Sequence, residues 1–138
     1  MKSAWNERDA QNSVGHYAKS SIGADLALRV YTTQLLGRDP KLVLHGGGNT
    51  SVKTSMRDLL GENAEVLCVK GSGWDMATIE PAGMPAVRLN ALRSLRARDA
   101  MADDEMVRVQ RASLLDPMAP NPSVETLLHA FVPRNTRL

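Results

Sequence analysis

The sequence has little that could form a disulfide, react as a thiol or cross a membrane. Its single cysteine, Cys68, has no partner for an intramolecular disulfide, which favours a reducing compartment. It lies in the apolar run of residues 66–69, where a thiol behaves as a small hydrophobe. No run approaches the ~20 apolar residues of a membrane span, and the polar N-terminus lacks the core of a secretory signal. We therefore expect a cytoplasmic protein without a membrane partner.

Aromatic residues and excess charge are also scarce. Phe, Trp and Tyr make up 4% of the chain, and 17 basic residues against 15 acidic ones give a net charge of +2. The arginines between residues 88 and 111 are interleaved with acids, and the aromatics are too few for a stacking platform. We expect no nucleic-acid partner.

The size and apolar content fit one globular domain. A chain of 138 residues with 43% apolar residues buries roughly two thirds of its unfolded surface. Residues 1–20 form a polar N-terminal segment that we expect to be loosely attached. Residues 21–138 then form the domain.

Apolar periodicity predicts alternating strands and helices. Helical spacing runs from Ser21 to Leu36, and the proline-rich segment 116–122 must be an extended loop. We expect strands at 42–44, 50–54, 66–69 and 86–89, a hairpin between the first two, and helices at 89–96, 103–115 and 124–131. The predicted fold class is α/β, a layered central mixed or antiparallel sheet flanked by helices.

Two glycine-bearing loops follow predicted strands. The first, LVLHGGGNTS over residues 42–51, places three glycines before small polar residues, and Asn49 adds a side-chain donor. Glycines permit positive φ, so consecutive N–H groups can converge on phosphate or carboxylate. The second loop, KGSG at 70–73, adds the charge of Lys70. The first loop matches neither the dinucleotide nor the P-loop pattern, so we predict a small phosphorylated or carboxylated ligand that lies across both loops.

Glu125 is the candidate general base. It falls in the first turn of a helix that Ser123 would cap, from which it can project toward both loops. An acid at this position is also favoured by the helix dipole, so its place in the sequence supports both readings equally.

Four segments in order resemble the class II aldolase/adducin N-terminal domain family, which includes zinc-dependent sugar-phosphate aldolases. They are GGNTS, VKGSG, ATIEP and PSVE, starting at residues 47, 69, 77 and 122. The likeness covers about residues 21–135 and is strongest to the aldolase part of bifunctional rhamnulose-1-phosphate aldolase/alcohol dehydrogenases.

This resemblance implies a site and a reaction. Phosphate or substrate would contact residues of both loops and of the segment before the last helix, namely Gly48, Asn49, Ser72, Gly73 and Ser123. Glu125 would be the catalytic acid/base that moves a proton on the dihydroxyacetone phosphate carbon. The implied function is an aldehyde-lyase (aldolase) of carbohydrate metabolism that acts on a rhamnulose-1-phosphate-like substrate, commonly as a homotetramer.

This sequence differs from that family at the positions of the metal ligands. The resemblance implies zinc held by a His-x-His pair after the glutamate helix and by a later histidine, but His16, His45 and His129 match none of these positions. We therefore expect no metal ligands in this chain, a fold incomplete at its C-terminal end, and an inactive or incomplete enzyme. The alternatives are an adducin-like binding and assembly module or a sugar-phosphate epimerase. His45 lines the first loop or faces the sheet, and the sequence does not choose.

Overall fold

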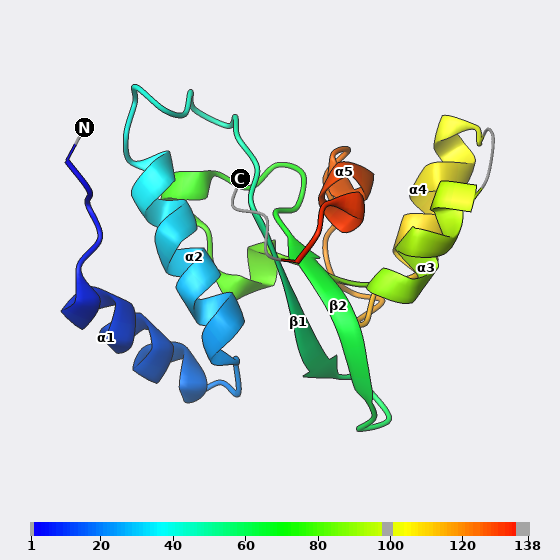
Figure 1. Ribbon diagram of the computed structural model, residues 1–138, viewed down its shortest axis with the longest axis horizontal. Helices are drawn as coiled ribbons and strands as arrows, with labels where there is room; N and C mark the ends of the chain where they lie inside the picture. The colour runs from blue at the N-terminus through cyan, green and yellow to red at the C-terminus, as the bar shows by residue number, and fades with distance from the viewer. Residues whose placement is uncertain (1, 98–100, 135–138) are drawn as a thin grey trace.

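A small antiparallel sheet lies between two layers of helices in the computed structural model, which describes residues 2–97 and 101–134 (Figure 1). The strand order is β1-β2-β3, and both neighbouring pairs are antiparallel. The three strands are β1 (Ser51–Arg57), β2 (Asn63–Val69) and β3 (Ala86–Arg88). The fold is therefore α/β, as predicted, with an antiparallel sheet.

Helices pack on both faces of the sheet. One layer holds α1 (Glu7–Ala18) and α2 (Ala24–Gly37), and the other holds α3 (Leu89–Ser94), α4 (Asp103–Ala112) and α5 (Thr126–Phe131) (Figure 1). Short 3-10 turns η1, η2 and η3 occupy Met76–Thr78, Pro81–Gly83 and Leu95–Ala97. Among the described residues, no helix is long and apolar enough to cross a membrane.

The central strand β2 separates two hydrophobic cores. Val66 and Cys68 pack toward α2, whereas Leu67 and Val69 pack toward α3 and α5. All four are fully buried, because side chains alternate between the faces of a strand and both faces are covered here. A continuous apolar run therefore marks β2, as the sequence predicted for residues 66–69.

The hairpin of the sheet differs from the predicted one. Residues 42–44 form no strand: the N–H groups of Leu42 and Val43 donate to the carbonyl of Asp39, and Leu44 is 81% exposed. The hairpin instead joins β1 to β2 through a turn at 58–62, where Asp58 accepts main-chain hydrogen bonds. The predicted hairpin between 42–44 and 50–54 is wrong, because three apolar residues do not distinguish a strand from a turn.

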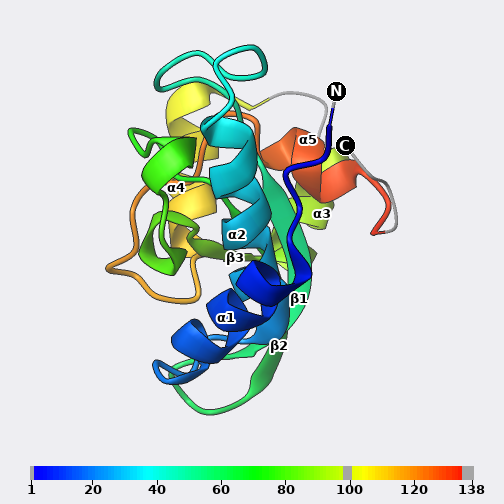
Figure 2. The same ribbon diagram turned by 90° about the vertical axis from the view of Figure 1, so that its left-hand side faces the viewer.

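The N-terminal segment contains a helix that the sequence analysis did not predict. Asn6 caps α1 by accepting a hydrogen bond from the N–H of Asp9, and Ala10 is buried against α2 (Figure 2). The Trp5 and Tyr31 rings meet edge to face at 5.3 Å. α1 consists mostly of polar residues and has Ala10 as its buried residue, so it lacks the large apolar side chains that mark a core-facing helix in a sequence.

Candidate functional site

Both glycine-bearing loops lie at one end of the sheet. In the antiparallel register Ser51, where β1 begins, pairs with Val69, where β2 ends. The pairing continues into the loops, because the N–H of Lys70 donates to the carbonyl of Thr50 at 3.0 Å. The two loops therefore leave the sheet side by side at residues 50 and 70.

The first loop has a specific backbone shape. Gly46 and Gly48 have φ values of +76° and +78°, in the left-handed region that favours glycine. A Cβ on Gly48 would lie 2.5 Å from Sδ of Met76. The N–H of Gly47 donates to the carbonyl of Leu44, so this amide is engaged within the turn.

Two threonines fix the point where this loop enters the sheet. Thr33 Oγ1 and Thr50 Oγ1 lie 2.6 Å apart, and both residues are buried. The Thr33 hydroxyl is also 2.6 Å from the carbonyl of Arg29 on the same helix. The end of the loop is thereby attached to α2.

Asn49 joins the first loop to the segment before α5. Its Nδ2 atom donates to Oγ of Ser123 at 2.5 Å and to Oε2 of Glu125 at 2.9 Å. The bond to a carboxylate fixes the orientation of the amide, since the reverse would set two oxygens against each other. The Oδ1 atom of Asn49 is buried and has no hydrogen-bond partner among the described residues. The side-chain NH2 group of Asn49 thus donates hydrogen bonds to two other predicted site residues.

The helix that carries Glu125 begins later than predicted. Residues 124 and 125 form a turn, α5 starts at Thr126, and Glu125 is its N-cap residue. Ser123 does not cap this helix with its side chain; its carbonyl accepts from the N–H and the hydroxyl of Thr126. The predicted start at residue 124 is wrong, because this carbonyl contact closes a turn before the helix begins.

Hydrogen bonds favour the ionised form of Glu125. The amide of Asn49 contributes most to lowering the pKa of this carboxyl group, followed by its own main-chain N–H, with a further contribution from Ser123. Burial acts in the opposite direction but is smaller. At neutral pH the exposed Glu125 side chain is therefore a carboxylate that can accept a proton.

The second loop is attached to the same segment. Gly71 forms an isolated bridge with Pro122, and the N–H of Ser72 donates to the carbonyl of Asn121 at 3.1 Å. Ser72 and Gly73 are exposed, and Gly73 has a φ of +84°. Lys70, in contrast, is only 5% exposed, with Nζ 3.5 Å from the carbonyl of Gly71.

A cavity of about 550 Å³ opens on one side of Asn49, between α2, β1 and α5. Gly48 and Asn49 line this cavity, whereas Ser72, Gly73, Ser123 and Glu125 are not among the described residues that do. Asn49 therefore hydrogen-bonds two of the predicted site residues, Ser123 and Glu125, and of the two glycine-bearing loops only the first reaches the cavity.

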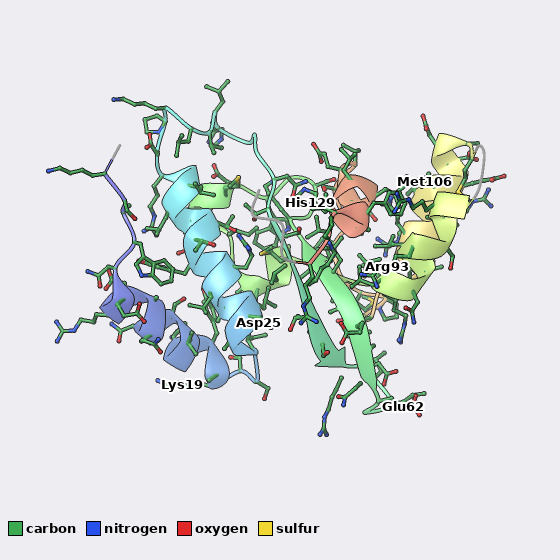
Figure 3. All side chains as sticks on the ribbon, in the orientation of Figure 1. Lys19, Asp25, Glu62, Arg93, Met106 and His129 are labelled. Carbon is green, nitrogen blue, oxygen red and sulfur yellow. The ribbon has the colours of Figure 1, made fainter. Side chains whose placement is uncertain are left out.

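His129 is a cavity residue that the sequence analysis considered only in relation to zinc. Its Nδ1 atom lies 2.7 Å from Oγ of Ser51 at the start of β1, so α5, which carries His129 (Figure 3), is attached to that strand. Burial lowers the pKa of this imidazole, the nearby Glu125 carboxylate opposes that effect, and Lys53 and Arg29 reinforce it. The available signal was its position four residues after Glu125, which places both on one helix face.

His45 neither lines the inside of the first glycine-bearing loop nor faces the sheet. Its side chain is 94% exposed, and Nδ1 lies 2.9 Å from Oδ2 of Asp75. Within residues 2–97 and 101–134, no three His, Cys, Asp or Glu side chains come together as a metal would require.

The chain is similar to a known family and to a curated protein. The chain matches the family model of the Class II Aldolase and Adducin N-terminal domain over residues 28–137. It is 45% identical over 104 residues to the uncharacterized oxidoreductase YuxG of Bacillus subtilis (strain 168), a match that covers 75% of this chain and 15% of that protein.

A solved structure is similar throughout most of the chain. This is the N-terminal class II aldolase domain of a conserved protein from Thermoplasma acidophilum, with a TM-score of 0.80 and 40% identity. The similarity covers 96% of this chain and 56% of that one. The chain thus spans part of the length of both relatives.

Proposed function

Because the chain belongs to the class II aldolase and adducin N-terminal domain family, we propose that it provides the phosphate-binding and proton-transfer groups of a sugar-phosphate aldehyde-lyase. The substrate would be similar to rhamnulose 1-phosphate, with dihydroxyacetone phosphate as a product. One observation carries this proposal: Asn49 donates to both Ser123 and Glu125, residues 74 and 76 positions away, where both glycine-bearing loops leave the sheet.

Each group has a separate role in this proposal. Gly48, Ser72, Gly73 and Ser123 surround the phosphate, with main-chain N–H groups and hydroxyls as donors. In the condensation direction Glu125, ionised at neutral pH, takes a proton from the carbon of dihydroxyacetone phosphate next to the carbonyl; in cleavage it returns a proton to that carbon after the carbon–carbon bond breaks. Asn49 orients Ser123 and Glu125, because both of its donors are already engaged by them.

The zinc of this family does not fit the described residues. No three ligating side chains converge among them, so no step of the proposed chemistry is routed through a metal. The name of YuxG describes an oxidoreductase, but this chain matches 15% of that protein. Neither glycine-bearing loop has the dinucleotide pattern, so hydride transfer is not part of the proposal.

Phosphate binding at the loops tests this function directly. We expect inorganic phosphate and dihydroxyacetone phosphate to shift the amide NMR signals of residues 71–73 in a saturable manner. Ser72→Ala and Ser123→Ala should each weaken binding by about tenfold or more, the value of one hydrogen bond to a charged group. Ser20→Ala, at an exposed position outside the site, is the matched control. Equal affinities in all three variants would contradict the proposal.

Turnover is a separate measurement. We expect little or no aldol cleavage of rhamnulose 1-phosphate by the 138-residue chain with added zinc, in an assay coupled to dihydroxyacetone phosphate release. Robust turnover that a chelator abolishes would show that the ligand argument is mistaken. Phosphate binding without turnover is also expected for an adducin-like binding module. Only a turnover assay on a protein that can bind the metal distinguishes the aldolase from the binding module.

A further inference from the structure

The proline-rich segment of residues 116–122 has little main-chain hydrogen bonding of its own. Three of its seven residues are prolines, which have no N–H to donate. Within the segment, the N–H groups of Met118 and Ala119 both donate to Asp116. None of the described helices and strands includes these positions. The shape of the segment therefore depends on contacts with other elements.

Arg111, in the last turn of α4, contacts this segment near both of its ends. Its Nη2 atom donates to the carbonyl of Pro117 at 3.1 Å, and its Nη1 atom donates to Oδ1 of Asn121. A guanidinium suits this arrangement, because it presents several N–H donors in a fixed planar geometry that the ammonium group of a lysine lacks. The two contacts together fix the distance between residues 117 and 121.

The proline-rich segment in turn supports the second glycine-bearing loop. The carbonyl of Asn121 accepts a hydrogen bond from the N–H of Ser72 at 3.1 Å. Gly71 pairs with Pro122 in an isolated bridge. Asn121 therefore contacts Arg111 with its side chain and Ser72 with its main chain, so one residue joins α4 to the second loop.

Arg111 lies at a part of α4 that is attached to the sheet. The chain that follows α4 runs along β3, where the carbonyl of Ser113 accepts from the N–H of Arg88 at 2.9 Å. Next to it, the N–H of Leu115 donates to the carbonyl of Ala86 at 2.9 Å. Ser113 and Leu115 are both buried. Contacts of Arg111 therefore hold the proline-rich segment in place relative to the sheet.

We propose that Arg111 is a positioning residue of the candidate site. It holds the proline-rich segment where Asn121 can orient the second glycine-bearing loop, and it thereby sets the position in which Ser72 meets a bound phosphate. Arg111 acts through Asn121, since its guanidinium is engaged by the proline-rich segment. This inference rests on the proposed function, because the phosphate is the ligand proposed there.

Exchange of main-chain amide protons tests the positioning role without any ligand. In Arg111→Met we expect the N–H of Ser72 to lose protection, because its acceptor on Asn121 is no longer held. The N–H of Gly71 donates to the carbonyl of Gly83 instead. It should keep its protection, which makes it an internal control. Unchanged protection at Ser72 would overturn the proposal.

Phosphate affinity tests the consequence for the site. When inorganic phosphate is titrated and the amide NMR signals of residues 71–73 are followed, Arg111→Met should weaken binding about threefold or more, the value of one ordinary hydrogen bond. Arg108→Met is the matched control, since Arg108 is an exposed arginine of the same helix that pairs with Asp104. This control removes the same charge and should leave the affinity unchanged. An equal loss of affinity in both variants would overturn the proposal.

Two further variants separate positioning from charge and from folding. Arg111→Lys keeps the charge but cannot make both contacts at once, so we expect an affinity between those of the wild type and Arg111→Met; it also serves if the methionine variant does not fold. Asn121→Leu removes the side-chain acceptor. Combined with Arg111→Met, it should weaken binding by less than the product of the two single effects, because both substitutions break one contact. Independent effects in the double variant would overturn the proposal.

The proposed function and this inference fail separately. If phosphate gives no saturable shift at residues 71–73 of the wild type, the proposed function fails, whereas a loss of Ser72 protection in Arg111→Met still supports the positioning role. Saturable binding with the same affinity in Arg111→Met and the wild type supports the proposed function and overturns the role of Arg111.

Discussion

Nδ2 of Asn49 and Oε2 of Glu125 lie 2.9 Å apart, although 76 positions separate them in the sequence. This hydrogen bond joins the glycine-bearing loop before β1 to the turn before α5. It is also the largest cause of the lowered pKa of Glu125. Removing the amide therefore has a measurable electrostatic consequence.

Asn49→Ala should raise the pKa of Glu125 toward its ordinary value of about 4.3. The carboxylate loses its main donor, and the remaining main-chain and Ser123 contacts lower the pKa less. Carbon-detected NMR titration of the Glu125 side chain measures this shift. Asn63→Ala, at an exposed position of β2, is the control and should leave the pKa unchanged. A Glu125 pKa that is identical in Asn49→Ala and the wild type would refute the assignment.

His129 should make the folded state sensitive to mild acid. Its pKa is lowered on folding, so the unfolded chain binds more protons and stability rises with pH. This contribution is fully present above the unfolded value of about 6.5 and is lost as pH falls below it. We expect the urea midpoint of the wild type to decrease when the pH is lowered from 7.5 to 5.5.

The His129→Gln variant isolates this effect. It should show a smaller fall in the urea midpoint over the same interval, because glutamine does not titrate. His16→Gln, exposed on α1, should behave as the wild type does. Identical pH dependence in both variants would mean that another group is responsible.

Gly46 and Gly48 form a matched pair for testing the loop backbone. Both have positive φ, but a Cβ at Gly46 meets nothing within 4 Å, whereas one at Gly48 overlaps Met76. We expect Gly46→Ala to cost about 1–2 kcal/mol of unfolding free energy and Gly48→Ala about 2–4 kcal/mol. Urea unfolding measures both values. A Gly46→Ala variant at least as destabilised as Gly48→Ala would contradict the geometry.

Cys68 should be unreactive in the folded protein. Burial raises the pKa of its thiol to about 12, so almost no thiolate exists at neutral pH. A disulfide reagent such as dithionitrobenzoate should label it at the rate of unfolding and immediately in concentrated urea. Fast labelling of the native protein would show that β2 is accessible.

The sequence predicts best those elements whose pattern comes from burial. Leu26, Val30 and Thr33 are all buried on one face of α2, as their spacing predicts. The apolar run of residues 66–69 becomes β2 because it is covered on both sides. Residues 42–44 are equally apolar but lie in a loop, and none of the described strands pairs with them. Local pattern cannot show whether a partner is present.

In the candidate site, too, some features can be recognised in the local sequence and others depend on distant parts of the chain. Glycine-bearing loops and Glu125 stand out because their residue types are unusual where they occur. The contact of His129 with Ser51 spans 78 positions. It leaves no local pattern in the chain. The contact of His45 with Asp75 likewise depends on how the loop folds back over η1.

The hydroxyl pair of Thr33 and Thr50 sets where the glycine-bearing segment can adapt. One end is locked into the sheet by this buried contact, while the other end, near the exposed Leu44, is held by turn hydrogen bonds. If this loop closed over a bound molecule, it would therefore pivot at Thr50. The largest displacement would be at His45, whose contact with Asp75 would have to break.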